Sequence, residues 1–141
     1  MSMEKCYEND QALIEYDAGN QALILTWKYF VQGEKYRETL LAFYDLSEQK
    51  NIKKWCFDSR EHGTIARNDQ QWVANETIKR AFHINPIKTA LVLSRNVFLQ
   101  HSIDNVIETI STRTNYEANN DIYRIFKTRE EGLEWLFEED Q

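Results

Sequence analysis

Length, composition and charge already exclude several classes of protein. The chain has 141 residues, of which 42% are hydrophobic and 28% charged, with one proline and four glycines. This is the composition of a folded domain, not of a linker or a disordered tail. The 17 basic and 23 acidic residues leave a net charge of −6. Nucleic acid and anionic membranes are therefore poor partners, because both are bound largely through concentrated Lys and Arg.

The chain also lacks the signals that direct a protein to or through a membrane. Its N-terminal residues have no apolar core of a signal peptide, and no stretch approaches the roughly eighteen apolar residues of a membrane helix. We therefore expect a cytoplasmic protein without membrane insertion, forming one domain over 1–141 with frayed ends at 1–10 and 138–141. Cys6 and Cys56 have no CxxC or Cys/His spacing, which predicts free thiols.

The N-terminal part has the pattern of a hairpin. Ile14 and Tyr16 alternate with acidic residues across 11–17, which is typical of a strand with one solvent-exposed face. Residues 17–20 contain Gly and Asn, which suit a tight turn, and an apolar strand follows over 22–27. These two strands are predicted to pair antiparallel.

The rest of the chain alternates between helical and strand periodicity. We predict strands at 52–57, 89–93 and 122–126, and helices from 34 to about 46, 68 to about 82, 99 to about 111, and 129 to 137. The order ββαβαβαβα predicts a single-domain α/β fold with a mainly parallel five-stranded sheet and an antiparallel edge strand. Thr128 and Glu131 have the spacing of a capping box for the last helix.

The stretch from Trp55 to Trp72 is the expected functional site. Its apolar strand ends at Asp58, a polar loop follows, and a helix begins near Asn68. In open α/β sheets, ligands and partners bind where loops leave the carboxyl ends of strands. The candidate partner-binding or ligand-binding residues are Asp58, Ser59, Arg60, His62, Asp69 and Trp72.

The element order and four segments resemble a known family. The segments WKYFVQGEKYRE, WCFDSRE, NDQQW and IYRIFKTREEGLEWL are similar to those of the short SpoIIAA-like proteins, which belong with STAS domains, over residues 11–137. The resemblance implies a β-α superhelix with sequential strands, helices mostly on one side, and a structural kinship to CRAL-TRIO lipid-carrier domains. It also implies regulatory binding of a protein partner, without catalysis.

This chain departs from the phosphoregulated members of that group. Those members carry a Ser at the start of the helix after the third strand, where a phosphate switches partner binding. Here the helix starts with Asn68, Asp69 and two Gln residues, so regulation by serine phosphorylation is not expected. Asp69 either mimics a phosphorylated residue or is an ordinary acidic residue at a helix start.

A hydrolase-like enzyme is a further alternative. Asp58 and His62 suggest an acid/base pair, but Ser59 lacks a GxSxG context and Cys56 lies mid-strand. The preferred interpretation is that Asp58 caps loop N–H groups, His62 is solvated and Arg60 pairs with an acidic neighbour, Glu61 or Asp69. No cofactor is expected, and the spacing of the three histidines predicts no metal site.

The aromatic residues favour a different alternative. Trp27, Trp55 and Phe57 lie on neighbouring strands, and with Tyr29, Phe30 and Trp72 they could line a pocket for a small lipophilic ligand. Packing of the core is the preferred explanation, because the second and third strands must bury side chains on both faces. A homodimer is a third possibility if all helices cover one sheet face. The leading hypothesis is a non-enzymatic protein that binds a protein partner through 58–72.

Overall fold

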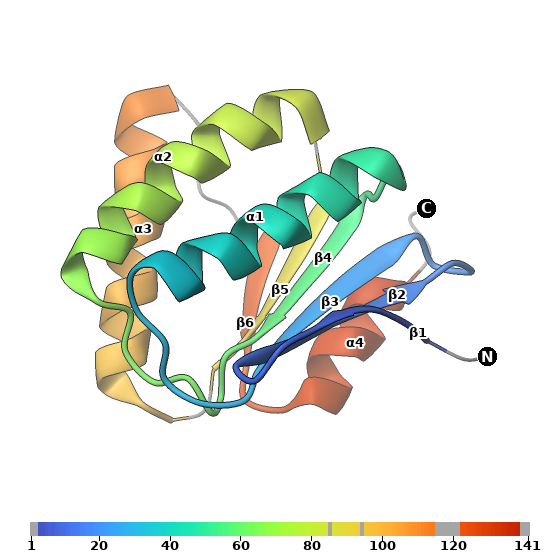
Figure 1. The fold of residues 1–141 in the computed structure, drawn as a ribbon, viewed down its shortest axis with the longest axis horizontal. Coiled ribbons are helices and arrows are strands. Elements are labelled where there is room, and N and C mark those ends of the chain that lie inside the picture. The colour runs from blue at the N-terminus through green and yellow to red at the C-terminus, as the bar shows by residue number, and fades with distance from the viewer. Residues whose placement is uncertain (1–2, 85, 94, 115–121, 139–141) are drawn as a thin grey trace.

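The computed structural model describes residues 3–84, 86–93, 95–114 and 122–138, and within them the chain alternates strands and helices (Figure 1). The strands are β1 (Glu4–Glu8), β2 (Ala12–Asp17), β3 (Ala22–Trp27), β4 (Lys54–Asp58), β5 (Lys88–Val92) and β6 (Tyr123–Phe126). The helices are α1 (Glu34–Gln49), α2 (Arg67–Ile84), α3 (Val97–Thr114) and α4 (Arg129–Phe137). The predicted α/β class is confirmed.

The N-terminal segment corrects the sequence-based prediction. Within 1–10, which we expected to fray, β1 pairs antiparallel with β2, with Glu4 facing Tyr16 and Glu8 facing Leu13. All its residues are exposed or half-buried, so the segment lacks the apolar alternation that reveals a strand in a sequence. The sheet of the described residues therefore has six strands where five were predicted. The predicted fraying at 138–141 falls mostly on residues outside the described part of the chain.

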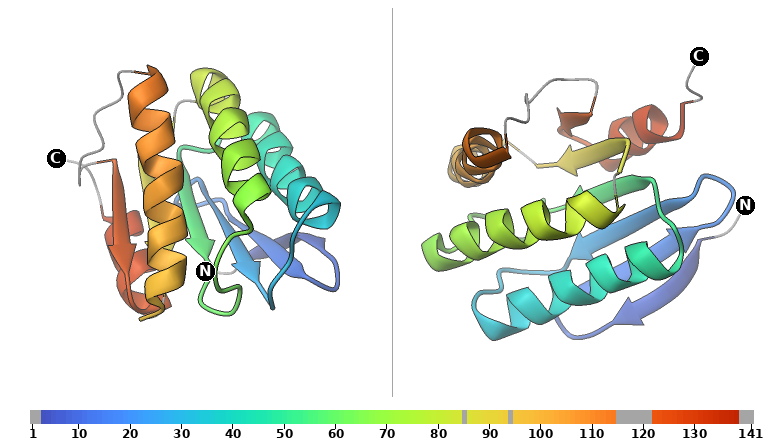
Figure 2. Two further views of the ribbon diagram at one scale, coloured as in Figure 1. Left: turned by 90° about the vertical axis from the view of Figure 1, so that its left-hand side faces the viewer. Right: turned by 90° about the horizontal axis from the view of Figure 1, so that it is seen from above.

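The strands lie in sequential order from β1 to β6, antiparallel from β1 to β3 and parallel from β3 to β6. Because crossovers between parallel strands are right-handed, a sheet that grows in one direction places its crossover helices on one face. Helices α1, α2 and α3 accordingly cover one face, and α4, which follows the last strand, packs on the other (Figures 1 and 2).

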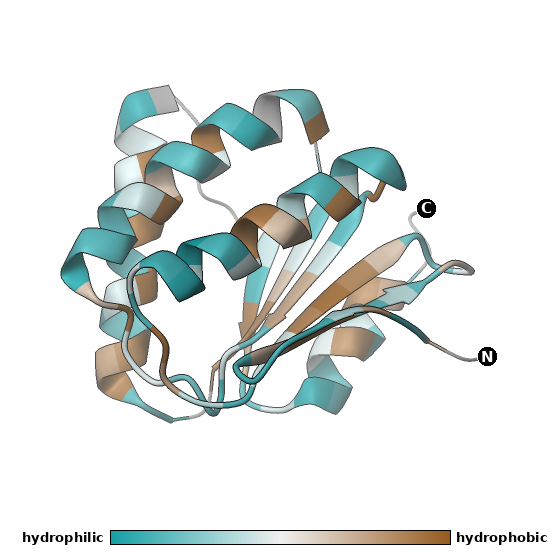
Figure 3. Ribbon diagram, in the orientation of Figure 1, coloured by the Kyte–Doolittle hydropathy of each residue, from teal (hydrophilic) through white to brown (hydrophobic). Residues whose placement is uncertain are grey.

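Strand β3 divides its side chains between two cores, because successive residues of a strand point to opposite faces. Leu23 and Leu25 face the layer of three helices, whereas Ile24 faces Trp135 and Leu136 of α4. In Figure 3 this strand is the most uniformly apolar part of the sheet. Since α4 covers the second face with residues of the same chain, the reason given for a homodimer no longer holds.

Candidate functional site

A large apolar cavity lies between the three-helix layer and the sheet. Its volume is about 540 Å³, within the range of roughly 300–1,000 Å³ that is typical of small-molecule sites. The aromatic side chains in its wall are Trp27, Tyr36, Tyr44, Trp55, Phe57 and Tyr123. The aliphatic side chains are Leu40, Ile65, Val73, Ile78, Leu91, Ile103, Val106, Ile107, Ile110 and Ile122. The cavity thus extends along the strands, beneath all three helices.

Hydrogen bonds within the wall hold two of the aromatic rings. Trp55 donates its indole N–H to Oγ of Ser47 at 3.0 Å. The hydroxyl of Tyr44 lies 2.8 Å from that of Thr77, which joins α1 to α2. Burial raises the pKa of Tyr44 to about 12, so its ring is neutral. With their polar atoms satisfied at the edges, both side chains present apolar surface to the cavity.

Three of the six aromatic residues suggested by the sequence line this cavity, namely Trp27, Trp55 and Phe57. Tyr29 and Phe30 do not, because both lie exposed in the loop after β3. Sequence reasoning missed the contributions of Tyr36, Tyr44 and the apolar face of α3. Their helical spacing was visible, but such a stripe is ordinarily buried against a sheet, so it was interpreted as core.

His62 closes one end of the cavity. It is 3% exposed and packs among the rings of Trp27, Tyr36 and Phe30, with centroid separations of 5.0, 5.4 and 5.4 Å. The interpretation of a solvated His62 is therefore wrong. The β4–α2 loop turns inward beneath the β3–α1 loop, and this is a tertiary contact that no local pattern encodes.

Both ring nitrogens of His62 are engaged by the backbone. The N–H of Val31 donates to Nε2 at 3.2 Å, and Nδ1 lies 3.1 Å from the carbonyl oxygen of Gly63. Nε2 also lies 3.0 Å from the carbonyl oxygen of Val31, so the direction of its hydrogen bond to Val31 depends on which nitrogen carries the proton. Burial lowers the pKa of His62 and so favours the neutral form.

Asp58 is buried on the opposite side of the sheet from His62. Its Oδ2 accepts from Nη2 of Arg60 at 2.8 Å and from Nη1 of Arg129 at 3.2 Å. Burial by itself raises the pKa of Asp58, but the hydrogen bonds and charge of Arg60, with help from Arg129, hold it below its ordinary value. Arg60 therefore pairs with Asp58, and not with Glu61 or Asp69 as the sequence suggested. Asp58 does also accept from a loop N–H, that of Arg60 at 3.4 Å.

The catalytic pair suggested by the sequence does not form. Among the described residues, Asp58 and His62 share no hydrogen bond, and each has other partners. The reason is the alternation of side chains along β4: Cys56 faces α4, and Asp58, two residues on, contacts Arg129 at the start of that helix. Ser59 follows on the cavity side, where it is 7% exposed and lines the wall.

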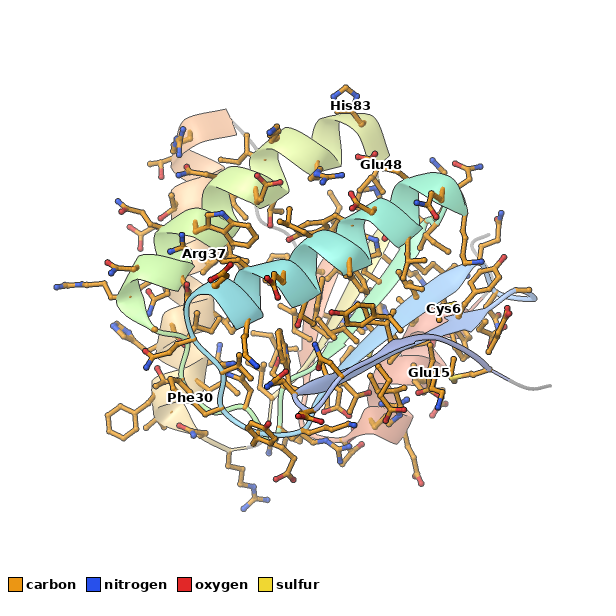
Figure 4. All side chains as sticks on the ribbon, in the orientation of Figure 1. Cys6, Glu15, Phe30, Arg37, Glu48 and His83 are labelled. Atoms are coloured by element: carbon orange, nitrogen blue, oxygen red, sulfur yellow. The ribbon has the colours of Figure 1, made fainter. Side chains whose placement is uncertain are left out.

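Asp69 connects the first turns of two helices. It is 1% exposed, and its carboxylate accepts from the N–H of Gly33 at 2.8 Å and from Nε of Arg37 at 3.0 Å. Figure 4 shows Arg37 between α1 and α2, where its guanidinium also lies 5.6 Å from the ring centroid of the half-buried Trp72. A buried, paired carboxylate presents no phosphate-like charge to a partner. Trp72 belongs to this cluster and does not line the cavity.

Exposed apolar side chains lie at the same edge of the sheet. Phe30 and Tyr29, after β3, are 44% and 47% exposed, and Val97 and Phe98, after β5, are 71% and 73% exposed (Figure 4 labels Phe30). The hydroxyl of Thr64 donates to the carbonyl oxygen of Phe98 at 3.4 Å, which joins the 59–66 loop to α3. The partner-binding residues predicted from the sequence include none of the four, and Tyr29 and Phe30 were considered only as pocket residues, because single exposed apolar residues look like core positions in a sequence.

Comparison with known proteins found no matching family model, no matching curated protein and no matching solved structure. The similarity to SpoIIAA-like proteins therefore stays a prediction. Within the described residues, no three or more His, Cys, Asp or Glu side chains are grouped so that they could hold a metal ion. No helix in that part of the chain is long and apolar enough to cross a membrane.

Proposed function

We propose that this protein binds a small lipophilic molecule in the cavity beneath α1, α2 and α3, as a carrier or a sensor. The observation that supports this function best is the wall itself. One hollow of about 540 Å³ is lined mostly by aromatic and aliphatic side chains. Sites of this kind bury most of the surface of a bound small molecule.

The size of the cavity argues against imperfect core packing. Protein cores are close-packed and contain few voids larger than a water molecule. The hollow of about 540 Å³ is far larger than such a void and is partly open to the surface. It is therefore expected to hold solvent or ligand, and its apolar wall favours an apolar ligand.

A blocking substitution tests this function. Ile107 lines the cavity, whereas the neighbouring Glu108 on α3 is exposed. N-phenyl-1-naphthylamine, an uncharged probe that fluoresces in apolar sites, should bind the wild-type protein saturably. We expect Ile107→Trp to weaken binding about tenfold or more, because the larger ring occupies ligand space, and the matched Glu108→Trp to leave binding unchanged.

Two results would count against the proposal. One is the absence of saturable probe binding to the wild-type protein. The other is equal binding by Ile107→Trp and Glu108→Trp when both variants have the wild-type circular dichroism spectrum. Native mass spectrometry of protein purified without removal of lipid provides an independent measurement, because a retained ligand adds its mass to the chain.

The second candidate is binding of a protein partner through the 58–72 edge, in the STAS manner. The exposed Tyr29, Phe30, Val97 and Phe98 support it, because large apolar side chains left in water on one edge are typical of interaction sites. Arg60, which belongs to the 58–72 segment, is also exposed.

A pull-down from the source cell's lysate tests this second candidate. The Phe30→Ser, Phe98→Ser double variant should lose a partner that the wild type retains. An Arg60→Ala, Trp72→Ala variant tests the residues proposed from the sequence in the same way. If all three proteins recover the same set of proteins, the edge is not a partner site.

A further inference from the structure

We infer that the cavity selects uncharged lipophiles with a single hydrogen-bonding head group, and that this head group lies between Ser59 and Tyr36. The inference rests on the proposed function and specifies its ligand. It separates alcohols, ketones and related neutral lipids from fatty acids and other anionic lipids. Three observations carry it: the charge of the wall, the two free hydroxyl groups, and the way the other polar groups are already paired.

The wall contains no charged side chain. Among the described residues that line the cavity there is no Lys, Arg, Asp or Glu, and the only imidazole, that of His62, is held neutral by burial. A carboxylate or phosphate placed there would lose its hydration without gaining an ionic partner, which is one of the most unfavourable events in a protein interior. The wall therefore disfavours an anionic ligand.

The nearest electrostatic influence on this end of the cavity reinforces that preference. The negative charge of Asp69 acts on both Tyr36 and His62. For Tyr36 it adds to burial, and both raise the pKa. For His62 it opposes burial, which lowers the pKa. The nearby cation, Arg37, already donates from Nε to Oδ1 of Asp69 at 3.0 Å. No compensating positive charge is thus supplied to a ligand from this pair.

Two hydroxyl groups at this end lack a partner. Tyr36 and Ser59 are 4% and 7% exposed, and both line the cavity. Within the described part of the chain, neither hydroxyl forms a hydrogen bond, and neither is sealed from open space as the Ser111 hydroxyl is. Buried polar groups are normally satisfied, so these two hydroxyls are available to pair with water or with a polar atom of a ligand that displaces it.

Contacts around His62 place the residues Tyr36 and Ser59 at one end of the cavity. The ring of Tyr36 lies 5.4 Å from that of His62, and the N–H of His62 donates to the carbonyl oxygen of Ser59 at 3.1 Å. The nitrogens of His62 are themselves occupied by backbone groups. At the other end, Thr89 and Tyr123 are partly exposed, so water satisfies their hydroxyls without a ligand. The head group therefore belongs at the His62 end, with the apolar body extending towards Tyr123.

A set of ligands with the same ten-carbon chain tests the inference. Decanol, decanoate and decane are each used to displace N-phenyl-1-naphthylamine from the wild-type protein at pH 8, where decanoate is ionised. We expect decanol to bind about tenfold or more tightly than decanoate, because only the anion loses hydration without a counter-ion. Decanol should also bind several-fold more tightly than decane, because only decanol has a group that pairs with the two hydroxyls.

Conservative variants locate the head group. Ser59→Ala and Tyr36→Phe should lower the affinity for decanol towards that for decane and leave the affinity for decane unchanged. The matched control is Tyr44→Phe, because its hydroxyl is already paired with Thr77 and its loss should affect both ligands equally. Circular dichroism confirms the fold of each variant, and the comparison of ligands on the wild type needs no variant.

The outcomes separate this inference from the proposed function. Decanoate binding as tightly as decanol would overturn the selection for uncharged ligands and leave a lipophile-binding site in place. Equal affinity for decanol and decane, unchanged in Ser59→Ala and Tyr36→Phe, would overturn the position of the head group. If neither the fluorescent probe nor any of decanol, decanoate and decane binds, the proposed function itself is overturned.

Discussion

His62 is held by backbone groups in a largely apolar setting. Nδ1 lies 3.1 Å from the carbonyl oxygen of Gly63, Nε2 lies 3.2 Å from the backbone nitrogen and 3.0 Å from the carbonyl oxygen of Val31, and aromatic rings surround the imidazole. Protonation would place a positive charge in this apolar setting. The hydrogen bonds to the two carbonyl groups and the charge of Asp69 favour the protonated form, but burial outweighs them and the pKa of His62 lies below its ordinary value of 6.5.

This lowered pKa predicts how the stability depends on pH. Below about pH 6.5 the unfolded chain takes up a proton at this histidine, whereas the folded chain does not until the pH falls through the lower folded pKa. The contribution to stability is therefore complete above about pH 6.5 and is lost as the pH falls below it. Urea unfolding between pH 7.5 and pH 5 should show a steeper loss for the wild type than for His62→Gln. Parallel pH profiles for the two proteins would contradict this assignment.

At the scale of elements, α4 depends on a glycine for its close approach to the sheet. A Cβ atom built on Gly132 would lie 3.0 Å from Cγ2 of Val92 and 3.5 Å from Cδ2 of Phe126. The helix begins at Thr128, whose hydroxyl accepts from the N–H of Glu131 at 3.2 Å, as the predicted capping box requires. Capping fixes where α4 starts, and Gly132 allows it to lie directly on β5.

Enlarging this glycine should loosen α4. We expect Gly132→Val to lower the free energy of unfolding by about 1–3 kcal/mol, because its methyl groups overlap Val92. Glu134→Val is the matched control, since Glu134 is exposed on the same helix and its replacement has only the small helix-propensity cost of valine. The measurement is the midpoint of urea unfolding. Equal midpoints for the two variants would show that the close approach of α4 contributes nothing to stability.

At the scale of the whole molecule, Arg129 joins parts of the chain that are far apart in sequence. Its guanidinium donates to Thr26 at 2.9 Å, to Asp58 at 3.2 Å and to Glu15 at 3.3 Å. One side chain at the start of α4 thus connects β2, β3 and the end of β4. It also shares the buried carboxylate of Asp58 with Arg60, which belongs to the loop beside the cavity.

Removing this connection should destabilise the fold as a whole. Arg129→Met keeps the length of the side chain but withdraws charge-assisted hydrogen bonds, each worth about 1.5–3 kcal/mol. We expect a loss of about 2–3 kcal/mol at pH 7, and little change for Lys127→Met, which alters an exposed residue of the same segment. Because the pKa of Asp58 is lowered in the folded protein, the difference should shrink as acid protonates this carboxylate. A difference that persists in acid would mean that Asp58 does not carry the effect.

Much of the fold could be predicted from local pattern. Alternation identified β2, an apolar run identified β3, helical spacing identified α1, and Thr128 with Glu131 marked the start of α4. Each of these features depends only on a few neighbouring residues. β1 was not predicted because none of its residues is fully buried, although Tyr7 packs against the core, so its sequence shows no apolar alternation. Sequence reasoning also selected the loop that contains Ser59 and His62, since it leaves the carboxyl end of a central strand.

The sequence by itself determined the α/β class, the order of elements and a set of apolar stripes, because periodicity records which side chains must leave water. It could not determine whether those stripes close on one another. Only the tertiary structure decided that the faces of α1, α2 and α3 surround a cavity, and that Asp58 and His62 lie on opposite sides of the sheet. The physical reason is that a hollow depends on the distances between elements, and those distances are set by contacts between residues far apart in the chain.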